Sequence, residues 1–373
     1  MKVLQILPEL NSGGVERGTL EIAAALIAAG HESLVVSNGG RLVGALEKAG
    51  SRHIAMPVHR KSLFTLAQVR PLRRLLEKER PDILHIRSRA PGWIAWLAWR
   101  GMDPATRPRL VSTVHGFYST NAYSAVMTRG ERVIAVSNSI RQYILKHYPA
   151  TEPGIIRVIH RGASPAAFPN GYQPDATWLE SWRKAQPQLA GREVLLLPGR
   201  ITRWKGQEHF VRLIAALKAR GRLVHGLLAG EVHPGKRGFA DEIMELARSL
   251  HVEKDITLLG HRSDLREVMA VSDLVLSLSL DPEAFGRVSL EAMAIGKPVL
   301  AYDHGGVAEQ LAVMFPQGAV PVGNQKALTA RAASLLDDTA RPGTIAAEFT
   351  LDAMCGSTLA VYEELQRSPR STP

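Results

Sequence analysis

Strand and helix patterns alternate along most of this chain, and no other feature of the sequence restricts its fold as much. In residues 1–165, short apolar runs typical of buried strands are separated by apolar helical segments such as Thr19–Ala29. The predicted strands of this half are Val3–Leu7, His31–Ser37, Arg52–Met56, Asp82–Arg87, Arg109–His115 and Arg132–Ser137. Such alternation is typical of a parallel sheet covered by helices on both faces. We therefore predict one doubly wound α/β domain over residues 1–165.

The same alternation begins again at residue 193 and continues to about residue 350. Its predicted strands are Glu193–Pro198, Leu223–Ala229, Ile256–Leu259, Asp273–Leu280 and Pro298–Tyr302. Residues 166–192 are rich in proline, glycine and polar side chains and interrupt the pattern, so we interpret them as a linker. The 373 residues suffice for two hydrophobic cores. We expect a second doubly wound domain over residues 193–350, followed by a helix at 351–366.

Cysteine use and hydropathy indicate the compartment. The single cysteine, Cys355, excludes an internal disulfide and agrees with a reducing cytoplasm. Met1 leads directly into the first predicted strand without the apolar segment of a signal peptide. No apolar run is long enough to span a bilayer. We expect a soluble, cytoplasmic protein.

The net charge of +11 is distributed unevenly. Residues 1–165 contain 23 Lys and Arg against 11 Asp and Glu, whereas the remainder contains 23 against 24. The first domain is therefore expected to meet a negative partner: nucleic acid, an anionic membrane or a phosphorylated glycolipid. The sequence shows no recognisable nucleic-acid module. A merely basic surface is the alternative.

One basic segment, between residues 59 and 80, also carries leucines at helical spacing. Its cations are Arg60, Lys61, Arg70, Arg73 and Arg74. Such a segment could lie on an anionic membrane surface, although the leucines suit a core-facing stripe as well. The prediction drawn from it is peripheral attachment to the inner face of the cytoplasmic membrane.

The segment Asp281–Gly296 carries the clearest chemistry. It follows a predicted strand, and we expect a helix from Phe285–Gly286 to Ala294–Ile295. The amides of Gly286, Arg287 and Val288 would then lie at a helix N-terminus, which is a site for phosphate. Glu283 precedes this helix and Glu291 follows two turns later on nearly the same face, where carboxylates can accept hydrogen bonds from sugar hydroxyls. This combination suits a nucleotide-sugar, and two solvated glutamates are the alternative.

Three further positions complete the candidate site. Arg200 and Lys205 flank a loop after a predicted strand, where a cationic pair can neutralise a diphosphate. The turn at Gly13-Gly14 can bring backbone amides close to a phosphate. It lacks the glycine spacing of a dinucleotide site, and the next strand lacks the acidic residue that binds ribose. His115 ends a predicted strand, where parallel sheets bind ligands.

Taken in order, these motifs resemble the retaining GT-B glycosyltransferases of family 4. The matching positions are Gly13-Gly14, His115-Gly116, Arg200 with Lys205, Glu283 with Glu291, and Gly305-Gly306 with Glu309. The segments around His85 and His115 resemble a bacterial subgroup associated with cell-envelope polysaccharide and lipopolysaccharide-core assembly. The resemblance implies two Rossmann-like domains that face each other across a cleft, the first for the acceptor and the second for the nucleotide-sugar. It also implies that the helix at 351–366 returns to the first domain.

The same resemblance implies roles for residues. His115 and Glu283 would be catalytic, and the donor would be bound by Gly13, Gly14, Arg200, Lys205, His261, Arg262, Phe285, Gly286, Arg287, Val288 and Glu291. The donor is expected to be UDP-linked and the acceptor a glycan or glycolipid. No cofactor or metal is expected, since Arg200, Lys205 and the predicted helix start would stabilise the leaving group instead. Consistently, the sequence has no Asp-x-Asp and no His/Cys ligand cluster. One loop departs from the family: members usually have Asn-Gly before an aspartate where this chain has His160-Arg-Gly-Ala-Ser-Pro165, and what this loop contacts stays open.

Two other kinds of function remain compatible with the sequence. One is a nucleotide-sugar epimerase or a phosphorylase, because one fold supports several activities. The other is a non-catalytic protein that binds a membrane or nucleic acid through the basic half. The presence of Arg200, Lys205, Glu283 and Glu291 together disfavours a pure binding protein, which has no use for them.

Overall fold

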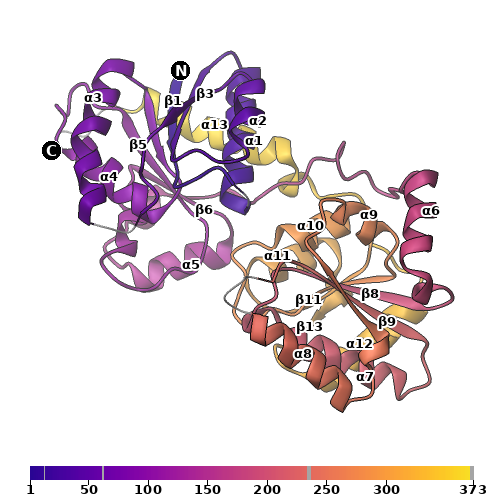
Figure 1. The fold of residues 1–373 in the computed structure, drawn as a ribbon. Coiled ribbons are helices and arrows are strands. Elements are labelled where there is room, and N and C mark those ends of the chain that lie inside the picture. Colours follow the sequence, from indigo (N-terminus) through magenta and orange to yellow (C-terminus); the bar gives the residue numbers. More distant parts are fainter. Residues whose placement is uncertain (12, 61–62, 233–236, 370–373) are drawn as a thin grey trace. The chain divides into compact units, whose positions relative to one another are not determined.

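Each half of the chain builds its own parallel sheet, and Figure 1 shows the helices around each one. The computed structural model describes residues 1–11, 13–60, 63–232 and 237–369. Two units divide the chain. Unit 1 contains residues 1–161 together with 351–373, and unit 2 contains residues 162–350. The predicted α/β class, with two Rossmann-like parallel sheets, is confirmed.

The described strands of unit 1 pair in the order β3-β2-β1-β4-β5-β6-β7, and all neighbours are parallel. The strands are β1 (Lys2–Ile6), β2 (Glu32–Ser37), β3 (Arg52–Ala55), β4 (Ile83–Ile86), β5 (Arg109–Val114), β6 (Arg132–Ala135) and β7 (Ile156–Val158). The helices are α1 (Gly14–Ala28), α2 (Val43–Lys48), α3 (Val69–Glu79), α4 (Arg89–Arg100), α5 (Asn138–His147) and α13 (Leu351–Arg367). The chain reverses its direction of growth between β1 and β4. Doubly wound sheets bind ligands at this reversal, beyond the carboxyl ends of the strands.

The C-terminal helix α13 packs on unit 1, although unit 2 separates it from that unit in the sequence. Its residues Met354, Val361 and Tyr362 are buried in one hydrophobic cluster with Val3 of β1 and Ile83 of β4. Full burial of a large apolar side chain contributes about 1.5–3 kcal/mol. The apolar face of α13 is therefore an integral part of the core of unit 1.

The described strands of unit 2 pair in the order β10-β9-β8-β11-β12-β13, again all parallel. They are β8 (Glu193–Pro198), β9 (Val224–Ala229), β10 (Ile256–Gly260), β11 (Leu274–Ser277), β12 (Val299–Tyr302) and β13 (Ala319–Val320). The helices are α6 (Ala176–Ala185), α7 (Gln207–Lys218), α8 (Arg237–Ser249), α9 (Leu265–Ala270), α10 (Arg287–Ala294), α11 (Gly305–Met314) and α12 (Gln325–Asp337). Here the reversal lies between β8 and β11, which places the loops after these two strands side by side.

The residues interpreted as a linker, 166–192, are instead part of unit 2. They contain α6, on which Trp178 and Trp182 stack with ring centroids 5.1 Å apart. Trp182 is buried in the core of unit 2, and Trp178 packs against that core. The proline and glycine content suggested an open connection. Instead, the two indoles lie one helical turn apart and pack α6 against the core of unit 2.

In the basic segment near α3, two of the leucines lie in the core, whereas Leu66 is 42% exposed. Leu72 and Leu76 are fully buried, whereas Arg70 and Arg74 are exposed. Lys61, which the sequence placed in the same cationic group, lies outside the described residues. Leu72 and Leu76 are therefore not available to a lipid surface. Among the described helices, none is long and apolar enough to cross a bilayer.

Candidate functional site

The candidate donor site lies where β8 and β11 end in unit 2. These strands pair at Leu274↔Leu195, so the loops that follow them leave from the same edge of the sheet. The first loop contains a short 3₁₀ turn, Arg203–Lys205, before α7, and the second leads into α10. The two loops are joined by a backbone hydrogen bond of 2.7 Å from the amide of Leu280 to the carbonyl of Trp204. Residues far apart in the sequence are thereby held in one place.

Lys205 and Glu283 form an ion pair across these two loops. Nζ of Lys205 lies 2.8 Å from Oε1 of Glu283, and the two side chains are 16% and 19% exposed. The same carboxylate oxygen accepts hydrogen bonds from the hydroxyls of Ser279 at 2.6 Å and Ser277 at 3.3 Å. Burial alone would raise the pKa of Glu283, but the Lys205 charge and these hydrogen bonds outweigh it and lower the pKa below its ordinary value. Glu283 is therefore held as an anion that can accept hydrogen bonds.

Helix α10 begins as the sequence predicts, one turn after Glu283. Gly286 has the left-handed backbone of a cap, with φ of 86°, and the helix runs from Arg287 to Ala294. A side chain on Gly286 would overlap Val307 of α11. The first amides of α10 have no partner within the helix, and the helix dipole gives this end a partial positive charge. The loop before α10 can therefore receive an anion beside the Lys205–Glu283 pair.

Helix α11 fixes the backbone of that loop. The amide of Gly306 donates to the carbonyl of Glu283 at 2.8 Å, and a Cβ on Gly305 would lie only 2.5 Å from the same oxygen. The buried side chain of Gln310 donates through Nε2 to the carbonyls of Phe285 and Gly286. The sequence motif singled out the two glycines and Glu309 but missed Gln310. Only its place on α11, next to that motif, could have indicated it.

Several predicted donor residues contribute in a different way from that expected. The ring of Phe285 is buried against Phe349, with centroids 6.0 Å apart, so only its backbone is available to a ligand. Val288 packs partly against the core of unit 2. Glu291 is buried, and its Oε1 lies 3.8 Å from Nε of Arg287. An acidic and a basic side chain therefore lie together on the first two turns of α10.

The remaining predicted residues of unit 2 lie on neighbouring loops. Arg200 is exposed, and its carbonyl accepts a 3.0 Å hydrogen bond from the buried side chain of Gln207. His261 is exposed, and Arg262 forms an ion pair with Asp264. These residues follow β10, which lies two strands away from β8 in the sheet. The guanidinium of Arg262 is thus already engaged, and its backbone is the part available to a nucleotide base.

In unit 1, His115 lies at the carboxyl end of β5 and is held by a residue the sequence left unassigned. Nη2 of Arg161 lies 2.6 Å from Nδ1 of His115. Burial, with the charges of Arg161 and Arg87, keeps the pKa of His115 well below its ordinary value. A guanidinium only donates, so Nδ1 must accept and the neutral ring carries its proton on Nε2. That Nε2 atom is buried and has no hydrogen-bond partner among the described residues.

The Gly-Gly turn lies beside these strands and corrects one predicted boundary. Helix α1 begins at Gly14 rather than at Thr19, with Gly13 as its cap at φ of 142°. Glycine discouraged a helical assignment, but at an N-terminus it serves as a cap. The turn follows β1, whose neighbour in the sheet is β4. The first amides of α1 are therefore at the reversal point of the sheet.

Two family models match the chain, one over each half. Residues 12–166 match Glycosyltransferase Family 4, and residues 180–348 match Glycosyl transferases group 1. The chain therefore carries these two glycosyltransferase domains in this order, on a GT-B fold. A solved glycosyltransferase from Rickettsia africae ESF-5 is similar to this GT-B protein with a TM-score of 0.86 and 29% identity, covering 99% of both chains. Anabaena Alr3699/HepE, solved in complex with UDP and glucose, has a TM-score of 0.80 and 22% identity over 99% of this chain and 100% of that one.

A curated relative is similar over part of its length. The alpha-maltose-1-phosphate synthase of Mycobacterium tuberculosis is 28% identical over 227 residues, which cover 55% of this chain and 53% of the relative. This GT-B protein therefore spans about half the length of the curated relatives it matches. The name of this relative refers to a sugar phosphate, not to lipopolysaccharide.

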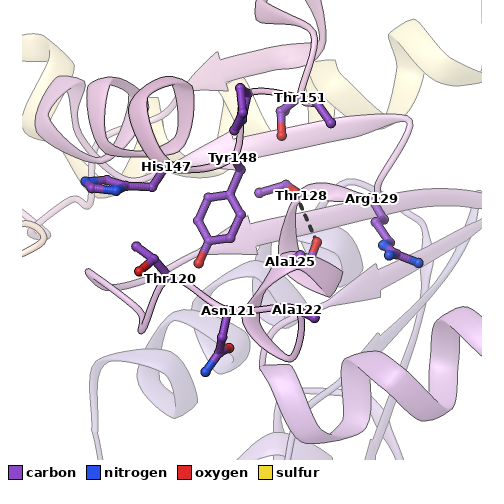
Figure 2. Close-up of a pocket in the computed structure, with 11 residues that line it drawn as sticks. Thr120, Asn121, Ala122, Ala125, Thr128, Arg129, His147, Tyr148 and Thr151 are labelled. Carbon is purple, nitrogen blue, oxygen red and sulfur yellow. Dashed lines mark hydrogen bonds between the residues drawn. The ribbon is translucent and has the colours of Figure 1, made fainter.

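A hollow of about 410 Å³ elsewhere in unit 1 of this GT-B protein contains none of the predicted residues. Figure 2 shows Thr120, Asn121 and Tyr148 around it, together with the hydrogen bond from Thr128 to the carbonyl of Ala125.

In the part of the chain that the structure describes, no group of three or more His, Cys, Asp and Glu side chains is placed to hold a metal ion.

Proposed function

We propose that this protein transfers a sugar from a UDP-linked donor to a glycan or glycolipid acceptor, with retention of anomeric configuration and without a metal ion. The observation that carries the proposal is the Lys205–Glu283 pair beside the N-terminus of α10. A carboxylate held ionised next to a site for phosphate is unfavourable unless it binds hydroxyl groups. The likeness to HepE, which was solved with UDP and glucose, supports the choice of donor.

In the proposed reaction, the bond between the anomeric carbon and the diphosphate oxygen breaks, and the electron pair leaves with the diphosphate. A new bond forms between that carbon and an acceptor hydroxyl oxygen, whose proton passes to the departing diphosphate. Arg200, Lys205 and the first amides of α10 would stabilise the negative charge on the leaving group. Glu283 would accept hydrogen bonds from sugar hydroxyls and stabilise positive charge at the anomeric carbon. Glu291 would bind the ribose.

For the acceptor, we propose a phosphorylated molecule of the cell envelope, such as the lipopolysaccharide core, at the inner face of the cytoplasmic membrane. The excess positive charge of residues 1–165 supports an anionic acceptor. Because Leu72 and Leu76 are buried, attachment to a membrane would rely on exposed cations such as Arg70 and Arg74. Such attachment is electrostatic, and each cation contributes about 1 kcal/mol near an anionic surface.

The proposal is tested in two stages. Thermal unfolding of the full chain with a panel of nucleotide-sugars identifies the donor, since a ligand of the native state raises the melting temperature. Release of UDP is then measured with and without candidate acceptors and with EDTA, and the anomeric configuration of the product is read by proton NMR. We expect acceptor-dependent release, an unchanged rate in EDTA and a retained anomer. Conversion of the donor without any acceptor would instead identify an epimerase.

A further inference from the structure

We propose that His304 is a positioning residue for sugar transfer, which holds the carboxylate of Glu283 in place through the peptide between Ser279 and Leu280. The inference rests on the proposed function, in which Glu283 accepts hydrogen bonds from the donor sugar, and it adds a residue to that function. His304 directly precedes the Gly305-Gly306 motif, and its residue type alone assigns it no role.

The ring of His304 donates a hydrogen bond to the loop that follows β11. His304 is the cap residue of α11, and its Nε2 lies 2.8 Å from the carbonyl oxygen of Ser279. A carbonyl oxygen only accepts, so Nε2 must carry a proton, as it does in one neutral tautomer and in the protonated ring alike. Ser279 is only 3% exposed, so water cannot readily replace this donor.

The peptide unit that carries this carbonyl is also held from its other side. Its N–H, that of Leu280, donates to the carbonyl of Trp204 at 2.7 Å. The peptide is trans, so its C=O and N–H groups point in opposite directions. The loop after β8 therefore binds one side of this peptide, and His304 binds the other. Rotation of the peptide would break both hydrogen bonds, which fixes the orientation of Ser279.

The side chain of Ser279 transmits this orientation to Glu283. Its hydroxyl donates to Oε1 of Glu283 at 2.6 Å, a shorter contact than those from Lys205 at 2.8 Å and Ser277 at 3.3 Å. All three donors reach Oε1, and within the described ranges no hydrogen bond reaches Oε2. Oε2 is thus the oxygen left for a sugar hydroxyl, and its direction depends on how Oε1 is held.

A second contact from the start of α11 supports the same segment but cannot replace His304. The amide of Gly306 donates to the backbone carbonyl of Glu283 at 2.8 Å. This bond fixes the backbone of Glu283, whereas several rotatable bonds separate that backbone from the carboxylate. The carboxylate itself is held by Ser279, and Ser279 by His304. Precise placement matters, because a shift of about 1 Å at a reacting group can lower a rate about 100-fold.

The test compares variants of the full chain. His304→Gln keeps an N–H donor close to the position of Nε2, whereas His304→Leu fills a similar volume without a donor. His225→Leu is the matched control, because this buried histidine of unit 2 also bonds one oxygen, the hydroxyl of Thr257 at 2.8 Å. His225 and Thr257 lie near the amino ends of β9 and β10, at the opposite edge of the sheet from the donor loops.

Turnover should separate positioning from a general loss of stability. His304→Leu should lower kcat about tenfold, as expected for the loss of one hydrogen bond that orients a reacting group. The KM of the donor and the affinity for UDP should stay those of the wild type. His304→Gln should restore most of kcat, and His225→Leu should keep the wild-type kcat. An equal fall of kcat in His304→Leu and His225→Leu would overturn the proposal.

Crystal structures of the variants test the contact independently of the reaction. In His304→Leu the hydroxyl of Ser279 should no longer reach Oε1 of Glu283, whereas in His304→Gln this hydrogen bond should remain. Its persistence in His304→Leu would overturn the positioning role. If His304→Leu does not fold, His304→Asn, whose shorter amide cannot reach the Ser279 carbonyl, replaces it in both measurements. Absence of turnover by the wild type would refute the proposed function alone, because the structures still decide the role of His304.

Discussion

Replacement of Lys205 by methionine should destabilise the protein as well as weaken donor binding. The sequence suggested only a cation that helps to neutralise a diphosphate. In the structure, Nζ of Lys205 lies 2.8 Å from Oε1 of Glu283, and both side chains are mostly buried. Methionine keeps most of the volume of the lysine stem but leaves the carboxylate of Glu283 without its counter-charge. The variant therefore isolates the electrostatic role of Lys205.

The magnitude follows from the geometry. Two unit charges 2.8 Å apart attract by about 6 kcal/mol at an effective dielectric constant of about 20. Desolvation of both groups offsets a large part of this attraction, and the hydroxyls of Ser277 and Ser279 continue to solvate Glu283 in the variant. We expect a loss of about 2–3 kcal/mol in the free energy of unfolding at neutral pH. For a unit of this size, this corresponds to a fall of roughly 5–10 °C in Tm.

The loss should depend on pH. In the wild type the pKa of Glu283 is lowered, so the stability that its ionised form contributes is present above its unfolded pKa and disappears as the pH falls through the folded pKa. In Lys205→Met burial remains without the counter-charge, and the pKa of Glu283 should rise instead. The difference in stability between wild type and variant should therefore be largest at neutral pH and shrink in acid.

The assay is urea unfolding of the full chain at pH 7 and at several acidic pH values. Arg200→Met is the matched control, because this exposed cation should bind the donor but has little to contribute to folding. Lys205→Met combined with Glu283→Gln should recover part of the lost stability, since the buried charge is then absent. If Lys205→Met unfolds at the same urea concentration as Arg200→Met throughout this pH range, the pair does not contribute to stability and the reasoning fails.

Three further outcomes are expected. Glu283→Gln should nearly abolish transfer while UDP binds normally. Glu291→Gln should instead weaken UDP binding by about tenfold, consistent with the loss of one hydrogen bond to a charged group. Equal effects of the two variants on UDP affinity would contradict these roles. Gly305→Ala should lower the free energy of unfolding, measured in urea, by about 1–3 kcal/mol, because φ at this residue is 62° and the new Cβ would overlap the carbonyl of Glu283. Gly343→Ala is the control, because a Cβ there meets open space. Similar stability of the two variants would contradict the packing described. In a vesicle sedimentation assay the protein should bind anionic but not neutral vesicles, and added salt should release it. The Arg70→Glu variant should bind anionic vesicles more weakly than the wild type. Equal binding to both kinds of vesicle would remove the membrane from the proposal.

The fold and much of the donor site could be predicted from local sequence patterns. Strand Glu193–Pro198 has the predicted bounds, because an uninterrupted apolar run buried on both faces leaves little choice of structure. The start of α10 was predicted to within two residues, since a strand, a proline and a glycine follow each other closely. Glu283 and Lys205 were both identified, but their direct contact was not, because it joins two loops 78 positions apart in the sequence.

Residues that act through tertiary contacts escaped the sequence. Gln310 supports the donor loop from a neighbouring helix, and nothing in its local surroundings distinguishes it from a solvated glutamine. Arg161 looks like an ordinary basic residue until it is found buried against His115. Sequence periodicity reports which face of an element is apolar, not which buried polar groups meet at the ends of strands.

Lys205 must serve two anions in the proposed reaction, the carboxylate of Glu283 and the diphosphate of the donor. Before the donor binds, the charge of Lys205 is largely compensated by Glu283 at 2.8 Å. A diphosphate therefore meets a cation whose field is already reduced, which limits how tightly UDP is held once the sugar has left. When the glycosidic bond stretches, negative charge grows on the diphosphate and positive charge on the anomeric carbon, so Lys205 and Glu283 each face a charge of opposite sign. Their mutual pairing thus costs ground-state affinity for UDP while both charges stabilise the transition state, which is the condition for binding energy to accelerate transfer.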